Sequence, residues 1–189
     1  LRAIDSINPQ DEAFGLALRG GVTTACTGPG SANVVGGTFA ILKLAGKRVD
    51  KMVLRSPAAM KCAFGENPKG CYGQGKKQSP MTRMAVAGLL RELLMRTIRY
   101  RDDKAAGKNP PLDVKLEAML PVVNREIPIK CHAHRADDIL TAVRIAREFD
   151  LKLTLDHCTD GEIIADELAE EGYPVFVGPS LGGKSKVEL

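Results

Sequence analysis

The last third of the chain alternates short apolar segments with helical patterns, and this alternation restricts the fold more than any other feature. Segments 129–134, 151–158 and 174–177 are short and rich in apolar or β-branched residues, which is typical of buried strands. Between them, 136–149 and 161–171 carry apolar residues at the spacing of one helix face. Helices of this length allow right-handed crossovers between parallel strands. The sequence therefore predicts an α/β fold built on a parallel sheet.

The first two thirds of the chain add further strands and a long helix, with no internal repeat and no clear domain boundary. We therefore predict a single domain over 1–189. Two glycine-rich stretches are expected to be loops: 28–37, directly after a strand, and 65–78, which is expected to be exposed. The other expected elements are a first helix capped by Asn8 and ended by Gly20-Gly21, strands at 22–27, 52–55 and 60–64, a long helix opened by Ser79-Pro80, and a shorter helix over 114–123.

Composition excludes several classes of function. The net charge is only +4, with three Tyr, five Phe and no Trp, and the sequence shows neither a basic stripe nor a stacking platform for nucleic acid. No apolar run approaches the roughly 18 residues of a membrane span. The loop 28–37 invites a nucleotide-binding hypothesis, but it matches no dinucleotide fingerprint, and the triplet Gly183-Lys184-Ser185 lacks the earlier glycine of a P-loop.

Five cysteines without a CxxC pair argue against a disulfide framework and against a zinc ribbon. Four of them lie in apolar, strand-like segments, where a reduced cysteine behaves as a small hydrophobe. We therefore expect a protein of the reducing cytoplasm. The four are Cys26, Cys62, Cys131 and Cys158.

All three histidines, His132, His134 and His157, lie at the carboxyl ends of expected parallel strands. In α/β folds, ligand-binding and catalytic groups collect at that edge of the sheet. One strand–helix unit separates His132 from His157, so neighbouring strands would bring the two imidazoles side by side, as a divalent metal such as zinc requires. The alternative, histidines that are hydrogen-bonded packing residues, stays open on spacing alone.

Several segments taken together resemble the bacterial amidohydrolases related to imidazolonepropionase. The resemblance extends over nearly the whole chain and is more specific than any one motif. The segments that carry it are Gly21-Val22-Thr23-Thr24, Ala63-Phe64-Gly65-Glu66-Asn67-Pro68-Lys69, His132-Ala133-His134-Arg135-Ala136-Asp137-Asp138-Ile139, Leu155-Asp156-His157-Cys158-Thr159 and Val177-Gly178-Pro179-Ser180.

The resemblance implies a (β/α)8 TIM-type barrel that binds one or two divalent metals, zinc above all, at its C-terminal mouth. By motif, His132 matches the fifth-strand metal ligand and His157 the sixth-strand ligand. His134 would then either contact a small-molecule substrate or orient a metal ligand, and Arg135 would contact the substrate. Asp156 lies where a residue that orients a ligand belongs. The implied reaction is hydrolysis of an amide, cyclic amide or related C–N bond by a metal-activated water.

The fourth strand of such barrels often supplies a carboxylated lysine or a glutamate that bridges two metals. Lys61 is the best match and Glu66 the alternative. A third interpretation of Lys61 is a lysine whose stem packs while its amine reaches solvent.

The resemblance also predicts what this chain lacks. The family's first strand carries a His-x-His pair and its eighth strand a metal-binding aspartate, and neither has a counterpart between Leu1 and Leu189. We therefore expect a partial barrel without its first and last strands, and weak metal binding or none in this chain alone. An alternative is a non-catalytic core fragment. Because open sheet edges favour pairing with another copy, we also expect a homo-oligomer.

Overall fold

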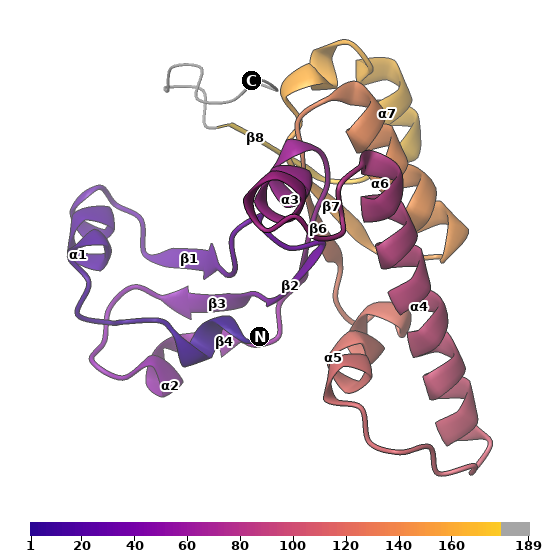
Figure 1. Cartoon of the computed structure of the whole chain (residues 1–189). Helices are drawn as coiled ribbons and strands as arrows, with labels where there is room; N and C mark the ends of the chain where they lie inside the picture. The colour runs from indigo at the N-terminus through magenta and orange to yellow at the C-terminus, as the bar shows by residue number, and fades with distance from the viewer. Residues whose placement is uncertain (179–189) are drawn as a thin grey trace.

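In a computed structural model of the protein, the structure is described for residues 1–178 (Figure 1). The expected turn at 178–180 and the triplet 183–185 therefore lie partly or wholly outside the described residues. The strands are β1 (Thr24–Thr27), β2 (Val35–Thr38), β3 (Ala40–Lys43), β4 (Val53–Arg55), β5 (Met60–Ala63), β6 (Ile129–Ala133), β7 (Leu153–His157) and β8 (Val175–Val177). The helices are α1 (Glu12–Arg19), α2 (Val49–Met52), α3 (Glu66–Lys69), α4 (Arg83–Ala105), α5 (Val114–Val123), α6 (Ala136–Glu148) and α7 (Ala165–Glu171), with short η1 (Ala3–Asp5), η2 (Gly70–Gly75) and η3 (Thr159–Glu162).

The main sheet has five strands in the order β2-β5-β6-β7-β8. The last four are parallel and follow one another in sequence, with helices in each connection, which confirms the parallel sheet predicted from the alternation. β2 pairs antiparallel with β5 at one edge. The described residues thus form an open run of strand–helix units, and no closed barrel is present among them.

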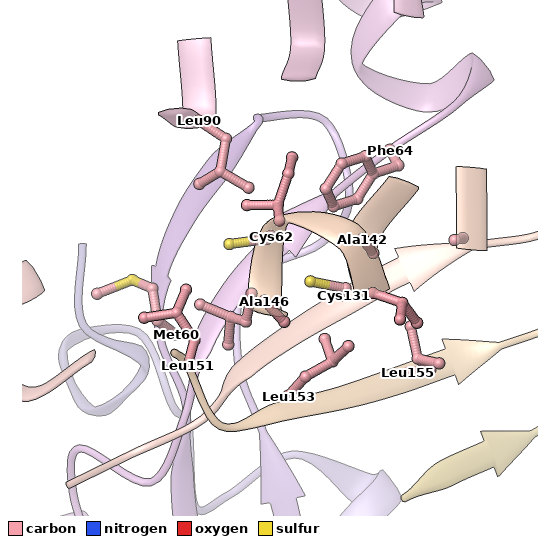
Figure 2. Packing of buried hydrophobic residues seen from close by; sticks show 14 of the residues in the cluster. Met60, Cys62, Phe64, Leu90, Cys131, Ala142, Ala146, Leu151, Leu153 and Leu155 are labelled. Carbon is pink, nitrogen blue, oxygen red and sulfur yellow. The ribbon is translucent and has the colours of Figure 1, made fainter. Parts of the chain in front are cut away.

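Helices α4 to α7 lie along one side of this sheet, and the main core fills the space between (Figure 1). The side chains that point toward the helices are apolar, because every second residue of a strand faces the same side. Figure 2 shows this packing, in which Cys62 and Cys131 sit between Leu90 of α4 and Ala142 of α6. The opposite side of the same strands carries the polar residues of the site described below.

A second sheet of three strands, β1-β3-β4, stands apart on the other side of the main sheet (Figure 1). The strands expected at 22–27 and 52–55 belong to this sheet, and all its pairings are antiparallel. The alternation of parallel strands with helices that the resemblance to a TIM-type barrel implies is therefore not found in the first third of the chain. Only Phe39 separates β2 from β3, so the chain passes from one sheet to the other within one residue.

Three local expectations also differ from the structure. The first helix begins at Glu12, because Asp11 accepts a hydrogen bond from the Ala13 amide, whereas Asn8 closes a turn with the Gln10 amide. The expected loop 65–78 contains α3 and the π-helical turn η2, since Pro68 falls in the first helical turn, where its missing N–H costs nothing. Cys26 is exposed rather than buried.

Candidate metal centre

Three imidazoles meet at the carboxyl edge of the main sheet. His132 is the fourth residue of β6, His134 follows that strand directly, and His157 ends β7. One potential ligand atom from each lies within 4.8 Å of the others. The ring centroids are 4.6 Å apart for His132–His134 and for His132–His157, and 4.9 Å apart for the stacked His134–His157 pair. The predicted proximity of His132 and His157 is present in the structure, and His134 joins them.

The register of the strands places the ends of β6 and β7 side by side. His132 lies opposite Asp156, and Ala133 lies opposite His157. The backbone then turns sharply, since both His157 (φ 75°) and Cys158 (φ 46°) are left-handed. Two consecutive non-glycine residues in this region are uncommon and cost free energy, so the surrounding contacts must hold them there. His132 and His134 are only 2% and 3% exposed, whereas His157 is partly exposed.

Each imidazole has one ring nitrogen held by a neighbouring group. The Asn67 side-chain amide donates to Nε2 of His132 over 2.9 Å. Nδ1 of His134 lies 2.8 Å from the Thr159 hydroxyl, and Nδ1 of His157 donates to the Gly178 carbonyl over 2.6 Å. Such contacts select the tautomer and the ring orientation of a metal ligand. The sequence prediction gave Asn67 and Thr159 no role, although both lie in the segments that follow strands bearing site residues, β5 and β7.

Below the imidazoles, on the same face of the sheet, lies a charged group that we call the lysine–aspartate cluster: Lys61, Lys130 and Asp156. Asp156 Oδ2 accepts from Lys61 Nζ at 3.3 Å, and its Oδ1 accepts from Lys130 Nζ at 2.5 Å. All three side chains are at most 14% exposed. The Lys61 amine is therefore buried rather than in solvent, and Asp156 binds two lysines.

The remaining predicted site residues lie at the rim. Arg135 precedes α6 and forms a two-pronged ion pair with Asp137, and its side chain is 46% exposed. Glu66 opens α3, directly after β5 and next to Asn67.

The buried cysteines are poor candidates for a nucleophile. Burial raises the pKa of the Cys158 thiol to about 11, with a smaller contribution from the nearby Asp156 carboxylate. Burial likewise raises the pKa of Cys131, which faces Cys62 on the helix side of the sheet. A thiol with a raised pKa is largely protonated near neutral pH, and the thiolate is the reactive form. The chemistry of this edge therefore rests on the imidazoles.

No protein-family model matches the chain. Its structure, however, is similar to the crystal structure of an amidohydrolase from Thermotoga maritima MSB8, with a TM-score of 0.94 and 44% sequence identity over 98% of this chain. This chain belongs to the amidohydrolase superfamily. Its sequence is also 28% identical, over 180 residues, to amidohydrolase tasK of Hapsidospora irregularis, which covers 82% of this chain.

The chain spans 50% of the Thermotoga amidohydrolase and 18% of tasK. Superfamily membership agrees with the position of the histidines at the carboxyl edge of the parallel strands, the edge at which α/β enzymes carry their active sites. None of the described helices is long and apolar enough to cross a bilayer.

Proposed function

We propose that this chain forms part of a metal-dependent amidohydrolase that cleaves a non-peptide C–N bond in a small molecule. The observation that carries the proposal is the convergence of three imidazoles whose potential ligand atoms lie within 4.8 Å of one another. Nitrogens that share one tetrahedral zinc lie about 3.3 Å apart, given Zn–N bonds of about 2.0–2.1 Å. Binding would therefore draw the imidazoles together by up to about 1.5 Å.

In this proposal His132 and His157 are the metal ligands. The Gly178 carbonyl holds the Nδ1 proton of His157, so Nε2 carries the lone pair that a metal needs. Coordination through Nε2 of His132 would replace the hydrogen bond from Asn67. A bound zinc or similar ion supplies a water of pKa about 7 and polarises the scissile group. His134 lies beside both ligands, and Arg135 at the rim keeps its proposed role in substrate contact.

Lys61 and Glu66 remain alternative proposals for a further ligand. Lys61 could bind metal only as a carbamate, because its ammonium is a donor without a lone pair. Carboxylation would turn the surplus of positive charge in the lysine–aspartate cluster, where two lysines share one carboxylate, into a surplus of negative charge that a divalent cation would offset. Glu66 offers a carboxylate directly, at the beginning of α3.

The proposal is tested by measuring metal content. We expect purified protein that also contains the neighbouring strands of the barrel to retain about one or two zinc equivalents and to hydrolyse members of an amide and cyclic-amide panel. We expect the 189-residue chain alone to retain much less zinc, because a catalytic zinc usually needs three protein ligands and water. Equal zinc in both proteins, measured by elemental analysis, would contradict the view that this chain carries only part of the site.

We propose in addition that the protein is a homo-oligomer of the cytoplasm. All five cysteines are free thiols, as a reducing compartment favours. Phe176 and Val177 of β8 are 56% and 81% exposed. Apolar side chains on an edge strand favour association with another copy. We expect sedimentation velocity to give at least a dimer at micromolar concentration, and a dimer that weakens in Phe176→Lys. A concentration-independent monomer would contradict this proposal.

A further inference from the structure

The loop after β7 is hydrogen-bonded to the segment that carries His134. We call residues Thr159 and Asp160 the β7 brace. Its backbone reaches across to β6, since the Asp160 amide donates to the His134 carbonyl over 2.9 Å. The preceding Cys158 amide donates to the Ala133 carbonyl over 3.0 Å. These bonds continue the β6–β7 pairing past the end of both strands.

The side chains of the β7 brace contact the same segment. The Thr159 hydroxyl lies 2.8 Å from Nδ1 of His134, and the Asp160 carboxylate accepts from the Ala136 amide over 3.1 Å. Ala136 is the first residue of α6, and the residue before it, Arg135, makes no side-chain capping bond. Asp160 therefore caps α6 from another loop, and it fixes the backbone that leads away from His134.

The two residues before the β7 brace, His157 and Cys158, have left-handed backbone conformations that direct the chain into it. His157 and Cys158 (φ 75° and 46°) turn the backbone at the end of β7 while the following residues stay hydrogen-bonded to the end of β6. Thr159 comes directly after this turn and lies 2.8 Å from Nδ1 of His134. The unfavourable backbone conformation is thus tied to a contact inside the histidine group, as is common where strained residues occur at functional sites.

We infer that Thr159 is a positioning residue that sets the tautomer of His134. Thr159 is exposed to solvent, so its hydroxyl proton can go to water while its oxygen accepts the Nδ1 proton of His134. The lone pair of His134 then resides on Nε2, the nitrogen on the far side of the ring from the Thr159 contact. In that tautomer His134 can act as a third metal ligand or as a base toward substrate. This role for His134 rests on the proposed function, whereas the tautomer itself does not.

The first measurement needs no metal. In protein labelled with 15N-histidine, at a pH where the imidazoles are neutral, two-bond 1H–15N correlation spectra distinguish the Nδ1–H from the Nε2–H tautomer. We expect His134 to be Nδ1–H in the wild type and in Thr159→Ser, which keeps the hydroxyl. We expect Thr159→Val, which keeps the shape and loses the hydroxyl, to show a mixed or reversed tautomer. A His134 signal unchanged in Thr159→Val overturns the inference.

The second measurement uses cobalt(II) affinity, followed by its visible absorption. We expect Thr159→Val to weaken binding by about 10–100-fold, the usual effect of removing a residue that orients a ligand, and Thr159→Ser to stay within about threefold. These affinities are measured in the protein that also contains the neighbouring strands of the barrel; if its wild type binds no cobalt, the proposed function fails and the tautomer result still decides the inference. If the wild type binds cobalt and Thr159→Val binds it equally well, the proposed function stands and His134 is not a ligand held by Thr159. Should Thr159→Val not fold, Thr159→Ala takes its place, with unfolding curves as the check.

Discussion

His132→Ala is expected to reduce zinc affinity by at least about 100-fold and to abolish hydrolysis. Mutating a residue that only orients a metal ligand typically lowers metal affinity by about 10–100-fold. Removing the ligand itself should lower it further. His132 is central to the group, because its ring centroid is 4.6 Å from both of the others. Competition with a chromogenic chelator measures the affinity, and His157→Ala is expected to give the same result.

The matched control is Lys152→Ala, an exposed residue just before β7 at the opposite edge of the same sheet. We expect its zinc affinity to equal that of the wild type. Because His132 is buried, thermal unfolding of His132→Ala must show a cooperative transition before its affinity is interpreted. Zinc stoichiometry and affinity that are the same in His132→Ala, His157→Ala and the wild type would remove the metal centre from this edge.

Asp156→Asn is expected to lower the free energy of unfolding by about 3–5 kcal/mol, the range for removing one partner of a buried ion pair. The substitution keeps the shape and leaves the ammonium groups of Lys61 and Lys130 buried without a counter-charge. Compensation by aromatic rings is unequal, since the Lys130 ammonium lies 3.8 Å from the centroid of the Phe176 ring, whereas the Lys61 ammonium lies 6.0 Å from that of Phe39. Urea unfolding followed by circular dichroism measures the loss.

Two comparisons isolate the charge effect. Asp50→Asn breaks an ion pair with Arg48 in which both side chains are more than half exposed, and we expect a loss below about 1 kcal/mol. Lys61→Met added to Asp156→Asn removes one stranded charge and should restore part of the stability. A loss in Asp156→Asn no larger than in Asp50→Asn would show that the lysine–aspartate cluster is solvated in solution.

The sequence predicted the last third of the fold well for a physical reason. Apolar spacing is set by burial against a single sheet face, so α6 occurs within a residue of its expected bounds and β6 to β8 within one or two. The helix expected over 161–171 begins only at Ala165, because the separate turn η3 precedes it. In the first third, strands of three or four residues carry too little pattern to reveal their partners. β2 contains two glycines, and the choice between two sheets depends on contacts distant in the sequence.

The same distinction holds for the candidate site. His132, His134 and His157 could be selected because they are the only histidines and all follow strand patterns. The contacts of Asn67 and Thr159 could not be predicted from the sequence, because they depend on the backbone path of two loops. The path of the loop after β7 depends on the left-handed conformations of His157 and Cys158. Unlike a glycine, these residue types do not indicate that conformation in a sequence. The lysine–aspartate cluster likewise depends on the register between β5, β6 and β7.

The single residue between β2 and β3 determines where this chain tolerates insertions. Phe39 joins two sheets, and its ring fills the space where a side chain on Gly28 would stand, 2.5 Å from the ring carbons. One added residue at this junction would exchange the inward and outward faces of one strand, because side chains alternate with a period of two. The exposed turn between α4 and α5, around Gly107, has no such constraint. Insertions, tags or new termini in an engineered version therefore belong at Gly107, whereas the length of the Phe39 junction must be kept.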